Sequence, residues 1–115
     1  MTQNDDPVMA PEALASLLGH VVVLDARPEA AVASGRCRGA VHLPIEAWDR
    51  AAKTASIGLG DAAHWASAIG ALGIDGSRAV AVLDDGRMTE AARGWFLLQH
   101  FGVPAAVVDG GWPAA

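Results

Sequence analysis

Cysteine is almost absent from this chain of 115 residues, which contains a single one, Cys37. One thiol forms no internal disulfide, so the fold must rest on its hydrophobic core, and the chain suits a reducing compartment. Basic residues are also few, since eight Lys and Arg stand against thirteen Asp and Glu and leave a formal net charge of -5. This balance provides no basic stripe for phosphates, so we expect no nucleic-acid partner.

Long apolar runs are missing as well. The longest aliphatic run, residues 21–24, is far shorter than the roughly 20 residues of a membrane-spanning helix. The first residues are polar and acidic, unlike the basic and apolar regions of a signal peptide. We therefore expect a cytoplasmic protein without membrane contact. With 52% apolar and 18% charged residues, the chain has the composition of one folded domain.

Several motifs of enzymes and metalloproteins are also missing. The four histidines have no metal-ligand spacing, and no second cysteine joins them, so we predict no metal site. A hydrolase nucleophile elbow, a phosphate loop and a dinucleotide fingerprint are likewise absent. We expect neither a metal nor a cofactor.

Three short apolar runs predict strands buried on both faces of a sheet. They are residues 21–24, 79–83 and 105–108. An aspartate directly follows each run, at Asp25, Asp84 and Asp109. Helical spacing of apolar residues predicts helices from Pro11, over 61–72 and over 88–101. Alternating strands and helices predict an α/β domain, with a small, mostly parallel sheet covered by helices on both faces and functional loops at the carboxyl ends of the strands.

Two of these expectations concern particular segments. Residues 1–10 are interpreted as a polar lead-in to a single domain over 11–115, and residues 41–60 show no clear period. The last predicted helix is expected to carry its apolar face on Ala92, Trp95, Phe96 and Gln99, with Ala91 and Leu98 adjoining it. Trp65 and Trp95 are expected in the core.

Five segments, in order along nearly the whole chain, resemble rhodanese domains. The likeness is strongest to the amino-terminal halves of two-domain thiosulfate or 3-mercaptopyruvate sulfurtransferases. It implies a three-layer, rhodanese-like α/β domain. The segments are 22–28 (VVLDARP), 35–44 (GRCRGAVHLP), 72–74 (LGI), 82–86 with 91–95 (VLDDG and AARGW), and 101–102 with 108–112 (FG and VDGGW).

The resemblance also implies a chemistry, and this sequence departs from it. Rhodaneses move a sulfane sulfur from a donor such as thiosulfate to an acceptor such as cyanide through a cysteine persulfide. The family places that cysteine directly after the central strand, where this sequence has Asp84. A carboxylate forms no persulfide, so we expect no catalytic residue in this chain. The amino-terminal halves of tandem sulfurtransferases typically carry an acid there too.

The degenerate loop is therefore the main candidate site. Asp84 and Asp85 can occupy an anion cradle or serve only as a helix cap and a turn, both common uses of aspartate. The family's substrates are anions, so two arginines, Arg27 and Arg93, are candidate anion contacts, although ion pairs with Asp25 or Asp109 explain them equally well. The loop comprises Asp84, Asp85, Gly86, Arg87, Met88 and Thr89.

Cys37 leaves two interpretations open. It stands where the family usually has an apolar residue, which favours a small buried side chain. Alternatively, the flanking Arg36 and Arg38 lower its pKa and make it a reactive or sulfur-accepting thiol.

The end of the sequence bears on partners. Residues 112–115 are interpreted as the opening of a helix with Pro113 in its first turn, so we expect the domain to be truncated at its last helix. The resemblance then implies a cysteine-bearing rhodanese domain as partner, in the same or a separate chain. The alternative is an inactive rhodanese-like domain that acts alone in binding or regulation.

Overall fold

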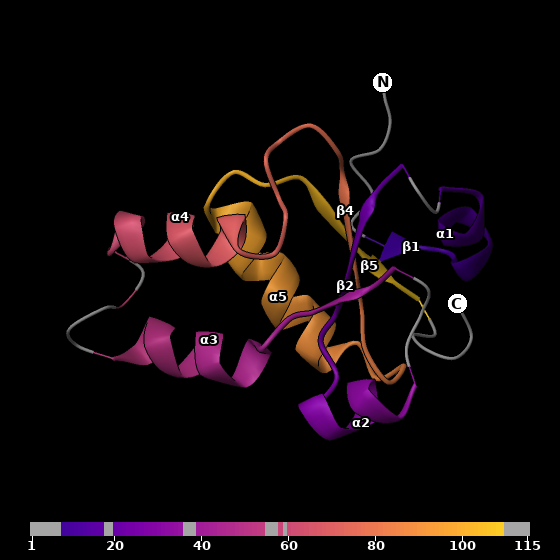
Figure 1. The fold of residues 1–115 in the computed structure, drawn as a ribbon, viewed down its shortest axis with the longest axis horizontal. Coiled ribbons are helices and arrows are strands. Elements are labelled where there is room, and N and C mark those ends of the chain that lie inside the picture. Colours follow the sequence, from indigo (N-terminus) through magenta and orange to yellow (C-terminus); the bar gives the residue numbers. More distant parts are fainter. Residues whose placement is uncertain (1–7, 18–19, 36–38, 55–57, 59, 110–115) are drawn as a thin grey trace.

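The computed structural model describes residues 8–17, 20–35, 39–54, 58 and 60–109. Strands and helices alternate along the chain (Figure 1). The strands are β1 (Val8–Met9), β2 (Val22–Asp25), β3 (Val41–His42), β4 (Val80–Leu83) and β5 (Ala105–Val108). The helices are α1 (Pro11–Leu17), α2 (Glu29–Ser34), α3 (Ile45–Lys53), α4 (Ala62–Gly70) and α5 (Thr89–His100).

All five strands lie in one parallel sheet of order β1-β5-β4-β2-β3. The predicted α/β class and its parallel sheet are thus confirmed, as is the strand–helix–strand crossover of β4, α5 and β5. The two short edge strands were not predicted. In particular, Val8 and Met9 pair with Val107 and Val108, so this part of the supposed lead-in belongs to the sheet.

The central strands are buried on both faces, as their unbroken apolar runs predict. Because side chains alternate along a strand, Leu24 and Val82 pack with α3, α4 and α5, whereas Val23 and Leu83 face the other way, toward Leu14 of α1. Figure 1 shows α3, α4 and α5 on one side of the sheet and α1 on the other. The sheet is therefore the middle of three layers.

Helix α5 faces the sheet with a different side than its sequence predicts. Ala91, Gly94 and Leu98 are buried at a spacing of three and four residues, and Phe96 is 54% exposed. Gly94 explains this choice, because a Cβ there would lie 2.7 Å from the side chain of Leu43. The helix approaches the sheet most closely at Gly94, where it has no side chain, so Phe96 points outward.

The two tryptophans that the sequence places in the core, Trp65 and Trp95, have different surroundings. Trp65 is fully buried, as predicted, and packs edge-on against Trp48 and parallel to Phe101. Its indole N–H donates to the carbonyl of Gly58 at 2.7 Å. Trp95 is only partly buried against the core, with its indole N–H bonded to the carbonyl of Ala105 at 3.0 Å.

None of the described helices has the length and apolar character needed to cross a bilayer.

Candidate functional site

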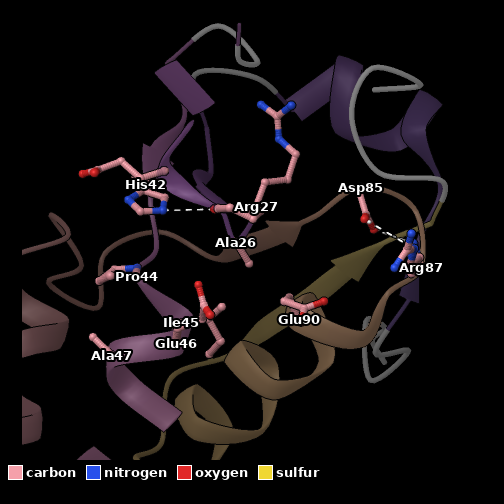
Figure 2. A pocket seen from close by; sticks show the side chains of 12 residues that line it. Ala26, Arg27, His42, Pro44, Ile45, Glu46, Ala47, Asp85, Arg87 and Glu90 are labelled. Carbon is pink, nitrogen blue, oxygen red and sulfur yellow. Dashed lines mark hydrogen bonds and ion pairs between the residues drawn. The ribbon is translucent and has the colours of Figure 1, made fainter. Parts of the chain in front are cut away.

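A cavity of about 440 Å³ opens at the carboxyl ends of β2 and β4 (Figure 2). In open parallel sheets this edge is where ligands bind, because the loops that follow the strands converge there. The segment after β2, the start of α3 and the loop before α5 form its walls. It is lined by Ala26, Arg27, Pro28, Glu29, His42, Pro44, Ile45, Glu46, Ala47, Asp85, Arg87 and Glu90.

Beside the cavity, the Asp84 carboxylate is enclosed by backbone N–H groups. Its Oδ1 accepts hydrogen bonds from Gly86 at 2.9 Å and Met88 at 3.1 Å, and its Oδ2 accepts one from Ala91 at 3.0 Å. The residue is 1% exposed. Asp84 therefore closes the turn and also caps the first turn of α5, whose Ala91 N–H has no partner within the helix.

The backbone of this loop is shaped for that enclosure. Gly86 (φ 104°) and Met88 (φ 67°) both adopt left-handed conformations, and among the described residues Met88 is the one non-glycine with positive φ. Such a conformation costs a β-carbon-bearing residue free energy, which the three hydrogen bonds to Asp84 offset. Both predicted uses of the aspartate, turn and helix cap, are thus combined in one side chain.

A second buried carboxylate, Asp25, holds Arg27 at the end of β2. The Arg27 Nη2 donates to Asp25 Oδ2 at 2.8 Å, and Nε donates to both carboxylate oxygens at 3.0 and 3.1 Å. The same Nη2 donates to the carbonyl of Gly35 just after α2 at 2.6 Å. The ion pair predicted as one explanation of Arg27 is therefore present, and it ties β2 to the end of α2.

This pairing gives Arg27 the structural role that the sequence offered as the alternative to an anion contact. Hydrogen bonding to the Asp25 carboxylate raises the pKa of Arg27 above its ordinary value. In Figure 2 its guanidinium extends away from Glu46 and Glu90, although the backbone of Arg27 lines the cavity. The carbonyl of Arg27 accepts a hydrogen bond from His42 Nε2 at 3.1 Å, which orients that ring at the cavity wall.

The remaining charges make the cavity acidic. Its lining holds four carboxylates against two guanidiniums, one of them already paired with Asp25. The other, Arg87, lies 3.6 Å from Asp85. Among the described residues that line the cavity there is no Ser, Thr or Cys. The described lining thus supplies no hydroxyl or thiol nucleophile, and its charge opposes the binding of an anion.

The other predicted site residues are not gathered here. Thr89 begins α5, and Arg93 lies one turn further along, 3.9 Å from Glu90, where it borders a separate groove between α3 and α5. Neither Asp25 nor Asp109 is its partner in the described ion pairs. Cys37 lies outside the described residues. In the part of the chain that the structure describes, no three His, Cys, Asp or Glu residues gather as metal ligands would.

The sequence did not predict that β3 and the start of α3 form one side of the cavity. His42, Pro44 and Glu46 lie in the segment without clear period, where a two-residue strand and a nine-residue helix follow each other closely. A signal was present, since Pro44 immediately precedes α3 and Ile45 and Trp48 are spaced three residues apart.

Comparison with known proteins identifies the family to which this architecture corresponds. The sequence model of the rhodanese-like domain matches residues 10–115. No curated protein sequence matches the chain significantly.

Solved structures with a similar fold include both long and short proteins. SseA from Escherichia coli, described as a 3-mercaptopyruvate sulfotransferase with the rhodanese fold, is 24% identical with a TM-score of 0.71, over 95% of this chain and 47% of SseA. The Leishmania major 3-mercaptopyruvate sulfurtransferase is 17% identical with a TM-score of 0.70, over 98% of this chain and 34% of that protein. The human single-domain sulfurtransferase is 18% identical with a TM-score of 0.59, over 94% of this chain and 93% of the human protein.

Proposed function

We propose, since this chain belongs to the rhodanese-like domain family, that it is the non-catalytic scaffold half of a sulfurtransferase. In this proposal Asp84 occupies the position of the sulfur-carrying cysteine, and a second rhodanese domain supplies that thiol across a shared cleft. The chain spans less than half of SseA and about a third of the Leishmania enzyme, which is compatible with one half of a two-domain protein.

The observation that carries the proposal is the state of Asp84. Sulfur transfer requires a thiolate that attacks the outer sulfur of thiosulfate, releases sulfite and becomes a persulfide; cyanide then takes that sulfur and frees the thiolate. Asp84 has no sulfur, and both of its carboxylate oxygens are engaged by backbone N–H groups. The described lining of the cavity beside it carries more carboxylates than guanidiniums, which does not favour an anionic donor.

The direct test is a thiosulfate–cyanide assay of the purified chain, beside its Cys37→Ser and Asp84→Cys variants. We expect no thiocyanate above the buffer rate from the chain or from Cys37→Ser. Asp84→Cys, made in the Cys37→Ser background, is expected to gain the mass of one sulfur atom after thiosulfate treatment, because the N–H groups that hold the carboxylate would stabilise a thiolate. Turnover by the unmodified chain would contradict the proposal, and loss of that turnover in Cys37→Ser would assign it to Cys37.

A partner is tested separately, by native mass spectrometry of the protein purified without denaturant. Co-purification of a cysteine-bearing rhodanese domain, covalently continuous or separate, is the expected result. Recovery of the 11.8 kDa chain alone favours the second candidate.

That second candidate is an inactive domain that binds a partner through the loop at residues 84–89. One observation favours it: the side chains of Asp85 and Arg87 are exposed at the mouth of the cavity, as a recognition loop requires, whereas Asp84 is buried beneath them. The similar human single-domain protein indicates that this fold occurs without a second half. Substituting Asp85 and Arg87 together would abolish partner binding in this case and leave the fold intact.

A further inference from the structure

Helices α3 and α5 enclose a groove that no described part of the sheet and no other described helix fills. The two helices pack side by side on one face of the sheet (Figure 1). The groove between them has a volume of about 440 Å³ and is separate from the cavity at the strand ends. It is lined by Asp49, Ala52 and Lys53 of α3 and by Ala92, Arg93, Phe96 and Leu97 of α5.

The floor and one wall of this groove are apolar. Phe96 is the most exposed of the large apolar side chains described, at 54%, and its ring stacks on His100 with centroids 6.2 Å apart. Because Gly94 turns the other side of α5 to the sheet, Ala92 and Phe96 form a second apolar stripe that no described element covers. An exposed apolar stripe on a helix next to a second helix is a typical receptor for a third helix.

The rim has a charge opposite to that of the whole molecule. Lys53 and Arg93 outnumber Asp49 in the lining, although the chain carries a net charge of -5. The Asp49 carboxylate accepts a hydrogen bond from Lys53 at 3.0 Å, and Lys53 and Arg93 together keep the pKa of Asp49 below its ordinary 3.8. Arg93 also lies 3.9 Å from Glu90, which lines the cavity at the strand ends, so each of the two cations has one acid nearby. The side chains of Lys53 and Arg93 are 74% and 51% exposed and so accessible to a partner.

We propose that this groove binds an acidic amphipathic helix of a partner protein. One apolar side chain of that helix packs against Phe96 and Ala92, and carboxylates on its flanks meet Arg93 and Lys53. At 1.5 Å per residue, α3 and α5 are about 14 and 18 Å long, so the groove accommodates about three turns of a helix. A second copy of this chain fits less well, because a two-fold pairing through this groove would place Lys53 and Arg93 of one copy against the same cations of the other.

The test uses two synthetic amphipathic peptides with leucines at helical spacing, one with Glu and one with Lys at all other exposed positions. Binding to the full chain is followed by fluorescence anisotropy of the labelled peptides at low salt. We expect the Glu peptide to bind at least about tenfold more tightly than the Lys peptide, and this preference to fall as salt is added.

Variants connect that binding to the groove. Phe96→Ala is expected to weaken binding of the Glu peptide about tenfold, and Arg93→Glu is expected to remove the preference for the Glu peptide over the Lys peptide. Matched controls are Val41→Ala, another exposed apolar residue, and Arg78→Glu, an exposed arginine before β4; neither is expected to change the affinity.

Two results would overturn the proposal. Equal affinity for both peptides, or affinity unchanged in Phe96→Ala, would show that the groove is not the receptor. Sedimentation equilibrium that detects a dimer of the chain, lost in Phe96→Ala, would assign the groove to a second copy instead. Because Phe96 and Arg93 lie away from Asp84, these results do not depend on the sulfurtransferase assays, and either proposal can fail without the other.

Discussion

The backbone N–H of Ala91 donates a hydrogen bond of 3.0 Å to Oδ2 of Asp84, seven residues earlier in the chain. This contact joins the end of the central strand β4 to the first turn of α5. With the bonds from Gly86 and Met88, it makes one carboxylate responsible for the geometry of the whole loop. The residue that replaces a nucleophile in this proposed scaffold is thus also a structural element of the domain.

Asp84→Ala is expected to lower the free energy of unfolding by about 3 kcal/mol, because the buried N–H groups lose a charged acceptor. Asp84→Asn, which keeps one carbonyl acceptor, is expected to lose about half as much. Asp85→Ala removes an exposed contact to Arg87 N–H and is expected to change stability by less than about 0.5 kcal/mol. Urea unfolding followed by tryptophan fluorescence measures all three, and equal losses for Asp84→Ala and Asp85→Ala would contradict this role.

Arg27→Met is expected to destabilise the fold by about 3 to 5 kcal/mol, because it leaves the fully buried Asp25 carboxylate without its cation. Arg27→Lys retains the charge but not the planar fork that contacts both oxygens, so it is expected to recover only part of the loss. Asp25→Asn with Arg27→Met should be more stable than Arg27→Met alone, since no charge is then buried unpaired. If the double variant is less stable than Arg27→Met, the lost stability does not come from the unpaired Asp25 carboxylate.

Gly94→Ala and Gly70→Ala are expected to change stability in opposite directions, although both place a methyl group on a helix. At Gly70 the new Cβ meets no atom within 4 Å, and a gain of about 0.5 kcal/mol is expected. At Gly94 it meets Leu43 at 2.7 Å, and overpacking outweighs the gain in helix propensity by about 1 kcal/mol. Thermal unfolding compares the two. In a Leu43→Ala background the loss at Gly94 should disappear; its persistence would locate the strain in the backbone.

Asp75 contributes a pH-dependent stabilisation. Hydrogen bonds from the Ser77 hydroxyl at 2.6 Å and backbone N–H at 2.9 Å lower the pKa of Asp75 below its ordinary 3.8. A carboxyl with a lower pKa in the folded state stabilises the fold above the unfolded pKa, and this stabilisation is lost as the pH falls through the folded pKa. The melting temperature of Asp75→Asn should therefore lie below that of the parent at pH 7, and the two should converge below pH 3.8. Ser77→Ala should narrow the difference at neutral pH, and a difference independent of pH would refute the assignment.

Much of this architecture follows from local pattern. The runs at β2, β4 and β5 show no polar alternation, so only burial on both faces satisfies them, which implies a parallel sheet between two layers of helices. The spacing of Trp65 and Ile69 likewise predicted α4 and its buried face. The aspartate after β4 was predictable as turn and cap, because these are local uses of the side chain.

The edge strands and the orientation of α5 were settled by contacts between distant segments. Strand β1 has two residues, too few for any period, and exists because Val8 and Met9 pair with β5 almost a hundred residues later. The outward position of Phe96 depends on how closely Gly94 approaches Leu43, which no pattern within α5 encodes. For Arg27 the sequence left two acids, Asp25 and Asp109, as possible ion-pair partners. In the structure Arg27 pairs with Asp25 and also donates to the carbonyl of Gly35 after α2. Residue periodicity thus specified which segments are buried, whereas packing between segments specified which face of α5 remains free, because steric fit depends on the opposing surface.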